Sequence, residues 1–285
     1  MTVALAGVLG SPIKHSKSPL IHNHWLKLNN IKGLYVPIEI RAEDLPGFIQ
    51  MAPRLGFVGF NVTIPHKGSI AHYCSELTET ALRAGSVNTL RFDEAGEALG
   101  DSTDGYGFLR NLEEKAGWSP KGKTIAMFGA GGAARAVAAA LIDNGAAELR
   151  VANRSAKRAE DLAKQLGRNT TCFDWDQASQ LAGVEAFVEG ADLLVNATSL
   201  GMDGGPEWRW ALPPLGSGVV ATDLIYAPLV TPFLETASAQ GATSVDGLGM
   251  LLHQAAPGFE RWFGRRPVVD DRLRDVVLQG EGALP

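Results

Sequence analysis

Residues 124–134 read TIAMFGAGGAA and decide the expected fold. The first five are apolar or β-branched and predict a buried strand, glycines follow, and an alanine-rich helix is predicted over 132–144. This order matches the G-x-G-x-x-A fingerprint of a dinucleotide-binding βαβ unit, whose helix N-terminus attracts phosphates. Gly129 allows the tight turn, Gly131 lets backbone approach a pyrophosphate, and Ala134 permits close helix–strand packing. A tight turn that binds nothing is the alternative interpretation.

The end of the next predicted strand, residues 149–152, indicates which dinucleotide would bind. In NAD-dependent proteins a carboxylate about 20 positions after the glycines accepts from the ribose hydroxyl and repels a 2′-phosphate. Here Asn153-Arg154-Ser155 follows the strand, Arg158 comes one helical turn later, and no acid is present. Because guanidinium groups bind phosphate through a planar fork, these residues favour NADP over NAD. The alternative is that both arginines are simply solvated on an exposed helix.

The fingerprint belongs to a longer alternation of strands and helices, which is typical of an α/β protein. After residue 123 we predict strands at 124–128, 149–152, 193–196, 219–224 and 243–245, with helices at 132–144 and 156–166. Before it we predict strands at 3–9, 34–38 and 58–63, helices opening at Ser18, Leu45 and Ile64, and a hairpin of 88–92 with 97–101. Helices at 248–263 and 270–278 finish the chain. The rhythm changes near Asp104 and Gly247, so we predict one domain of residues 1–103 plus 248–285 and another of 104–247.

Composition narrows the function classes. With 285 residues, 45% hydrophobic and 20% charged, the chain is long enough for two folded domains. Its net charge of −5 and lack of a basic stripe argue against nucleic acid. Cys74 and Cys172 form no CxxC pair, which predicts neither a disulfide framework nor a zinc site. No apolar run approaches membrane-spanning length, and residues 1–9 suit a strand better than a signal peptide, so we expect a cytoplasmic protein.

Polar residues gather in the front half where a core would not need them. Ser16 and Ser18 flank Lys17 ahead of a predicted helix and could bind a carboxylate, although Ser18 could equally be the helix N-cap. Asn61 and Thr63 are two residues apart on a predicted strand and therefore share a face.

Lys67 would lie at the start of a predicted helix, where the dipole disfavours a cation, and this mismatch suggests a functional lysine. His22 and His24 are two residues apart on a helix and so lie on different faces, and we expect no metal site. His66 could act as a base, but a packing or surface role is the more ordinary interpretation.

Eight segments, in this order, resemble the shikimate dehydrogenase family over essentially the whole chain. They are residues 10–19 (GSPIKHSKSP) with His22-Asn23, 59–67 (GFNVTIPHK), 84–90 (AGSVNTL), 103–108 (TDGYGF), 129–133, 153–155, 196–202 (NATSLGM) and 246–251 (DGLGML). The resemblance implies a mixed-sheet α/β substrate domain, a doubly wound Rossmann-like NADP domain, and C-terminal helices that return to the first domain. It implies reversible NADPH-dependent reduction of 3-dehydroshikimate to shikimate.

The resemblance also implies a role for individual residues. Lys67 and Asp104 would be the catalytic pair. Substrate would be bound by Ser16, Ser18, Thr63, Asn88, Tyr226 and Gln254. NADP would be bound by Gly129, Ala130, Gly131, Gly132, Ala133, Asn153, Arg154, Ser155, Arg158, Leu224 and Gly247. Three positions depart from the family pattern: Ser102 replaces the usual Asn, Ser86 the usual Ala, and Ser155 the commoner Thr.

The implied chemistry is coherent. Hydride transfer to the keto group places negative charge on its oxygen, so a cationic donor such as Lys67 would stabilise the transition state and supply the proton. Asp104 would favour the charged lysine, so the two groups would titrate as a pair. Whether Lys67 carries the proton or acts as an electrostatic clamp stays open at this stage. Two other functions remain as alternatives, an NAD-dependent quinate/shikimate dehydrogenase and a non-catalytic nucleotide sensor. The oligomeric state is left as either a monomer or a homodimer.

Overall fold

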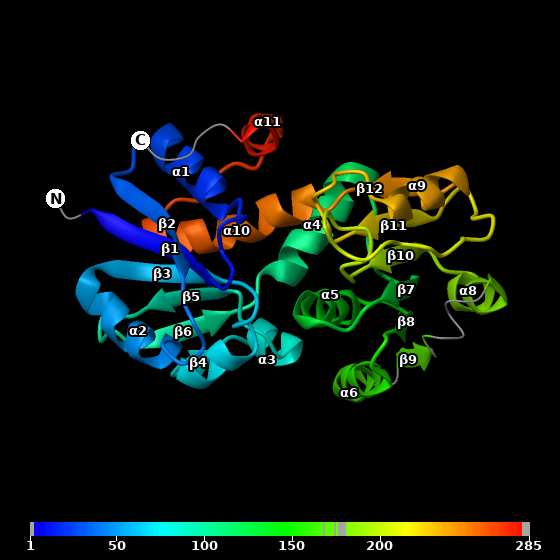
Figure 1. Cartoon of the computed structure of the whole chain (residues 1–285), viewed down its shortest axis with the longest axis horizontal. Coiled ribbons are helices and arrows are strands. Elements are labelled where there is room, and N and C mark those ends of the chain that lie inside the picture. The colour runs from blue at the N-terminus through cyan, green and yellow to red at the C-terminus, as the bar shows by residue number, and fades with distance from the viewer. Residues whose placement is uncertain (1–2, 168, 174, 176–180, 281–285) are drawn as a thin grey trace. The chain divides into compact units, whose positions relative to one another are not determined.

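The computed structural model describes residues 3–167, 169–173, 175 and 181–280. They divide into two compact units, a first unit of Met1–Gly107 with Leu252–Pro285 and a second unit of Phe108–Leu251. The chain changes unit inside two helices, α4 (Asp104–Ala116) and α10 (Leu248–Phe263) (Figure 1). Among the described residues, no helix combines the length and the apolar character that crossing a membrane requires.

The first unit contains a six-stranded mixed sheet of order β2-β1-β3-β5-β6-β4 (Figure 1). The strands are β1 (Ala4–Gly10), β2 (Gly33–Glu39), β3 (Phe57–Val62), β4 (Glu76–Leu77), β5 (Thr89–Phe92) and β6 (Ala98–Asp101). β1 pairs in parallel with β2 and β3, whereas β5 runs antiparallel to both β3 and β6. The predicted hairpin is therefore confirmed, and it joins the edge of a parallel βαβ arrangement.

Helices of the first unit pack on this sheet or on one another. They are α1 (Ser18–Leu28), α2 (Leu45–Met51), α3 (Glu79–Ala84) and α11 (Asp271–Gln279), with two short 3-10 helices, η1 (Ala52–Leu55) and η2 (Ser69–Tyr73). Trp25 of α1 is fully buried against Phe259 of α10, with ring centroids 5.3 Å apart. Trp262 of α10 donates from its indole nitrogen to the Leu90 carbonyl of β5 at 2.7 Å. The C-terminal segment is thus packed on the first sheet, as predicted.

The second unit contains a wholly parallel sheet of order β9-β8-β7-β10-β11-β12. Its strands are β7 (Thr124–Phe128), β8 (Glu148–Ala152), β9 (Thr170–Phe173), β10 (Leu193–Asn196), β11 (Val220–Asp223) and β12 (Thr243–Val245), and its further helices are α5 (Gly132–Asp143), α6 (Ala156–Leu166), α8 (Leu181–Val188) and α9 (Pro232–Ala239). Numbered within this unit the order is 3-2-1-4-5-6, that of a doubly wound nucleotide-binding sheet. The order in which strands are added to the sheet reverses between β7 and β10. Ligands of such sheets bind at the carboxyl ends of the strands at that point.

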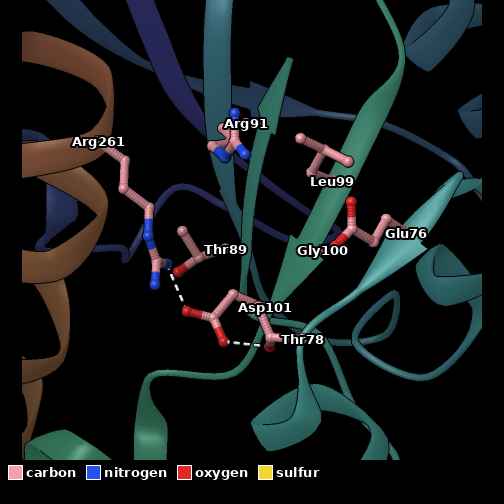
Figure 2. Close-up of a pocket in the computed structure, with 8 residues that line it drawn as sticks. All are labelled: Glu76, Thr78, Thr89, Arg91, Leu99, Gly100, Asp101 and Arg261. Atoms are coloured by element: carbon pink, nitrogen blue, oxygen red, sulfur yellow. Dashed lines mark hydrogen bonds and ion pairs between the residues drawn. The ribbon is translucent and has the colours of Figure 1, made fainter. Parts of the chain in front are cut away.

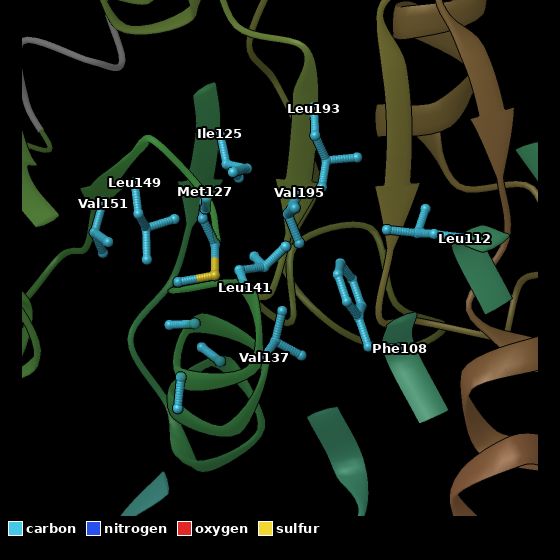
Figure 3. Packing of buried hydrophobic residues seen from close by; sticks show 14 of the residues in the cluster. Phe108, Leu112, Ile125, Met127, Val137, Leu141, Leu149, Val151, Leu193 and Val195 are labelled. Carbon is cyan, nitrogen blue, oxygen red and sulfur yellow. The ribbon is translucent and has the colours of Figure 1, made fainter. Parts of the chain in front are cut away.

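Residues of β7 alternate between two cores, which explains why the whole strand is apolar. Met127 packs with Val137 and Leu141 of α5 on one face (Figure 3). Phe128 packs on the other face with Phe187 of α8, at a ring-centroid distance of 4.8 Å. Helices on both faces confirm the doubly wound fold.

Two local predictions were wrong. Ser18 is the first residue of α1 rather than its N-cap; Lys17 occupies the cap position and makes no side-chain capping bond. Ile64 does not open an α-helix, because residues 64–68 form turns that lead into η2, so Lys67 lies on a turn. The helix α4 and the short elements η1, η2, β4, α3, β9, α8 and α9 were not predicted.

Candidate active site

Lys67 and Asp104 form an ion pair in the first unit. Lys67 comes from the turn after β3, and Asp104 is the first residue of α4. Their side chains are 19% and 6% exposed, so water reaches the ammonium group while the carboxylate is nearly buried.

Asn88, at the start of β5, connects this pair to two other polar groups. Its Nδ2 amide donates to Asp104 Oδ1 at 2.8 Å, to Gln254 Oε1 at 3.0 Å and to Thr103 Oγ1 at 3.0 Å. Its Oδ1 accepts from the Thr103 backbone N–H at 2.8 Å. Lys67, Asn88, Asp104 and Gln254 therefore form one hydrogen-bonded group, hereafter the polar cluster. Thr103 also belongs to this network and was not among the predicted binding residues, although it lies in the Thr-Asp-Gly segment.

Backbone hydrogen bonds hold the turn of Lys67 in place without an α-helix. The Lys67 carbonyl accepts from the Val87 N–H at 2.8 Å, and the Asn88 N–H donates to the Asp101 carbonyl at 3.0 Å. The Val62 N–H donates to the Asn88 carbonyl at 2.8 Å. These bonds fix β3, β5 and β6 against one another at the edge where the polar cluster lies.

A buried amide, Asn61, contacts the backbone of Asn88 in the polar cluster. Its Oδ1 accepts from the Tyr35 hydroxyl at 2.7 Å and lies 3.2 Å from His22 Nε2, and its Nδ2 donates to the Asn88 carbonyl at 3.2 Å. Complete burial lowers the pKa of His22 from 6.5 to about 3, despite the opposing hydrogen bond to Asn61, so this imidazole is neutral at pH 7.

His66 has a structural partner. It is 1% exposed, and its Nε2 donates to the Ile40 carbonyl at 2.8 Å, which supports the packing interpretation over a role as base. No group of three or more histidine, cysteine or acidic side chains suited to a metal ion occurs in the part of the chain that the structure describes.

The other predicted substrate residues of the first unit lie outside the hydrogen bonds of the polar cluster. Ser18 donates from its backbone N–H to Ser16 Oγ at 3.3 Å, and Thr63 follows β3 with a half-buried side chain. Two of the departures from the family pattern are buried: Ser86 and Ser102 are 3% and 7% exposed, and their hydroxyls have no partner among the described residues.

The glycine turn of the second unit has the backbone geometry that the fingerprint requires. Gly129 has φ +111°, and a Cβ there would lie 2.6 Å from the Ala197 carbonyl oxygen, so only glycine fits. Gly131 is the N-cap of α5, so no side chain caps the first N–H groups of this helix. A Cβ on Gly131 or Gly132 would meet no atom within 4 Å. The α5 N-terminus is therefore open to an approaching anion, as a pyrophosphate needs.

The loop after β8 presents unpaired positive charge beside that turn. Asn153 Oδ1 accepts from the Ala130 N–H at 3.0 Å, which ties the loop to the glycine turn. Arg154 and Arg158 are exposed, and neither side chain has an ion-pair or hydrogen-bond partner within the described ranges. Ser155 is the N-cap of α6 without a side-chain capping bond. Two guanidinium groups, a hydroxyl and a helix N-terminus are a donor set that fits a phosphate monoester.

The remaining predicted residues of the second unit follow β11 and β12. Leu224 and Tyr226 follow β11, and burial raises the pKa of the Tyr226 phenol. A Cβ on Gly247 would lie 2.4 Å from the Ile225 carbonyl oxygen, so this position tolerates no side chain. Asp223 supports the loop by accepting from the Ile225 N–H at 2.9 Å.

The strand order and the glycine turn define a dinucleotide-binding α/β protein, and comparisons with known proteins specify it further. Three family models match: the shikimate dehydrogenase substrate-binding domain over residues 8–90, the shikimate/quinate 5-dehydrogenase domain over 111–201, and the shikimate 5′-dehydrogenase C-terminal domain over 247–270. A protein of a Ruegeria species named shikimate dehydrogenase (NADP(+)) is 50% identical over 97% of this chain and 98% of its own length. The chain belongs to the shikimate dehydrogenase family.

Solved structures agree with this membership. Shikimate 5-dehydrogenase of Thermus thermophilus in complex with NADP(H) and shikimate superposes with a TM-score of 0.82 at 34% identity, covering 98% of this chain and 99% of the other. Quinate dehydrogenase of Corynebacterium glutamicum in complex with NAD superposes with a TM-score of 0.87 at 31% identity, covering 97% and 99%. The fold is therefore shared by members that differ in substrate and cofactor.

Proposed function

We propose that this chain catalyses the reversible NADP-dependent reduction of 3-dehydroshikimate to shikimate. The observation that carries the proposal is the Lys67–Asp104 ion pair, which Asn88 joins to Gln254 in one polar cluster. The names of the 50%-identical relatives support the same activity. The first unit would bind the substrate and the second unit the nucleotide. These are the roles we assign to the predicted domains 1–103 plus 248–285 and 104–247, whose boundaries lie four residues before those of the units.

Lys67 would act at the substrate oxygen. In the direction of reduction, the ammonium group stabilises the negative charge that develops on this oxygen and donates a proton to it. In the reverse direction a neutral Lys67 accepts the hydroxyl proton. Asp104 Oδ2 pairs with the Lys67 ammonium and Asp104 Oδ1 accepts from Asn88, so both carboxylate oxygens are engaged and the carboxylate is fixed beside Lys67.

The remaining predicted residues would orient the ring. Ser16, Ser18 and Tyr226 would bind the substrate carboxylate. Thr63, Asn88 and Gln254 would bind its hydroxyl groups, since an amide both donates and accepts.

NADP, when bound, supplies or accepts the hydride. Residues Gly129, Ala130, Gly131, Gly132 and Ala133 would bind its pyrophosphate, and Asn153, Arg154, Ser155 and Arg158 its 2′-phosphate. Leu224 and Gly247 would lie beside the nicotinamide. The open N-terminus of α5 and the unpaired arginines support this assignment, and the missing acid after β8 argues against NAD.

We further propose that the protein works in the cytoplasm as a monomer or homodimer, without a nucleic-acid partner. The net charge of −5 and the lack of a basic stripe support the last point.

A comparison of four reactions tests the proposal. Purified protein is assayed for reduced cofactor with shikimate or quinate, each with NADP⁺ or NAD⁺. We expect the highest kcat/KM for shikimate with NADP⁺. A preference for quinate with NAD⁺ would favour the activity named for the C. glutamicum neighbour, and nucleotide binding without turnover of either substrate would favour the sensor.

A further inference from the structure

Asp101 lies three residues before Asp104, and its carboxylate has several hydrogen-bond and ion-pair partners. It is the last residue of β6 and is 7% exposed. Its Oδ1 accepts from the Ser102 backbone N–H at 2.7 Å and from the hydroxyls of Thr78 and Thr80, each at 2.5 Å. The carboxylate therefore ties the start of α3 to the backbone that leads into Asp104.

The other oxygen of Asp101, Oδ2, forms an ion pair with Arg261 of α10. Figure 2 shows Arg261 reaching from its helix toward Asp101, with Thr78 on the opposite side of the carboxylate. Burial raises the pKa of Asp101, but the hydrogen bonds from the two threonines and the charge of Arg261 outweigh it, and the pKa lies below its ordinary value. Asp101 is thus an anion at neutral pH.

Arg261 comes seven residues after Gln254 on α10. A spacing of two helical turns places both side chains on the same face of the helix. At the Gln254 end, Thr103 Oγ1 donates to the Gln254 carbonyl at 2.8 Å. α10 is consequently fastened to residues 101–104 at two points, by Arg261 on Asp101 and by Gln254 on Thr103.

We propose that the Asp101–Arg261 pair is a positioning device for the polar cluster, which fixes the segment bearing Asp104 against the helix bearing Gln254. Neither residue touches the reacting groups. This inference rests on the proposed function, because it assigns the pair a role in the rate of that reaction.

The surroundings of Arg261 make the idea testable without unfolding the protein. The pair borders an open pocket of about 200 Å³, which Arg91 and Glu76 also line (Figure 2). The Arg261 side chain is 35% exposed. Replacing it with methionine therefore leaves no sealed cavity, and the aliphatic stem is retained.

The test compares Arg261→Met with Arg266→Met. Arg266 is the control because it also pairs with a carboxylate, Glu260 at 2.7 Å. It donates to the Tyr106 hydroxyl of α4 at 2.6 Å but makes no hydrogen bond or ion pair with residues 101–104, the segment that Arg261 is proposed to fix. We expect Arg261→Met to lower kcat with shikimate roughly 10-fold or more, since small misplacements of reacting groups have effects of this size. KM for NADP⁺ should stay unchanged, Arg261→Lys should recover part of the rate, and Arg266→Met should behave as wild type.

Amide hydrogen exchange over residues 101–104, which Arg266 does not contact, gives a readout independent of turnover. In Arg261→Met the Ser102 and Thr103 amides should exchange faster than in wild type, and in Arg266→Met they should not. Wild-type kcat in Arg261→Met, or equal loss in both variants, would overturn the proposal. If the wild type fails to oxidise shikimate, the proposed function fails, and unchanged exchange in Arg261→Met would then refute the positioning device separately.

Discussion

Removal of the Arg154 guanidinium should change the cofactor preference of this protein. Arg154 follows β8, is exposed, and has no partner within the described structure, so its charge is available to a ligand. A charge-assisted hydrogen bond contributes about 1.5–3 kcal/mol, and solvent screening at an exposed site favours the lower part of that range. Because about 1.4 kcal/mol corresponds to a tenfold change, Arg154→Ala should raise KM for NADP⁺ roughly 10-fold.

The same substitution should leave KM for NAD⁺ nearly unchanged, because NAD has no 2′-phosphate. Lys157→Ala is a matched control on α6, since Lys157 is already paired with Asp161 at 3.2 Å. The assay is steady-state kinetics with both cofactors at saturating shikimate, repeated at two salt concentrations because exposed charges are screened. An unchanged ratio of kcat/KM for NADP⁺ to that for NAD⁺ in Arg154→Ala would refute the reasoning.

Two further predictions concern stability. Gly129→Ala should lower the free energy of unfolding by about 1–3 kcal/mol, because Gly129 has a positive φ and a Cβ there would lie 2.6 Å from the Ala197 carbonyl oxygen. Gly131→Ala, the control, should leave the thermal midpoint of unfolding unchanged. Equal thermal midpoints for the two variants would contradict this prediction. His22, whose pKa falls from 6.5 to about 3 on folding, binds a proton more readily in the unfolded chain, so its contribution is present above pH 6.5 and is lost as pH falls toward 3. Between pH 6 and 4.5, the free energy of unfolding measured with urea should therefore fall more steeply for wild type than for His22→Gln, by up to about 1.4 kcal/mol per pH unit. The same pH dependence of this free energy in both proteins would refute the assignment.

The parts of the fold that the sequence predicts are those with a local signal. β7 and α5 follow from an apolar run, a glycine turn and an alanine-rich segment, and the two-faced burial of Met127 and Phe128 explains the uninterrupted apolar pattern. α9 was missed although Thr231 and Pro232 give an ordinary N-terminal signal, and the Thr231 side chain does cap Leu234. The local signal for α9 is therefore present in the sequence.

Other features depend on contacts between distant residues and could not be predicted. Pro65 suggests a helix start, but residues 64–68 form turns and the Lys67 carbonyl accepts from the Val87 N–H. A hydrogen bond between residues 20 positions apart leaves no pattern in the neighbouring sequence. Asp101 and Arg261 are 160 residues apart in sequence, and no periodicity relates them. For the polar cluster, the family resemblance supplied Lys67, Asn88, Asp104 and Gln254, while the participation of Thr103 became evident only from its hydrogen bonds.

The rate of hydride transfer in Lys67→Met tests the central claim most directly. Methionine keeps the length of the stem but removes the charge and the proton, so kcat should fall by about 10²–10⁴-fold while calorimetry still detects shikimate binding. Lys123→Met, which removes a lysine paired with Asp192 in the second unit, should keep the wild-type rate. Turnover by Lys67→Met at the wild-type rate would contradict the assignment of Lys67 as the group that stabilises charge on the substrate oxygen.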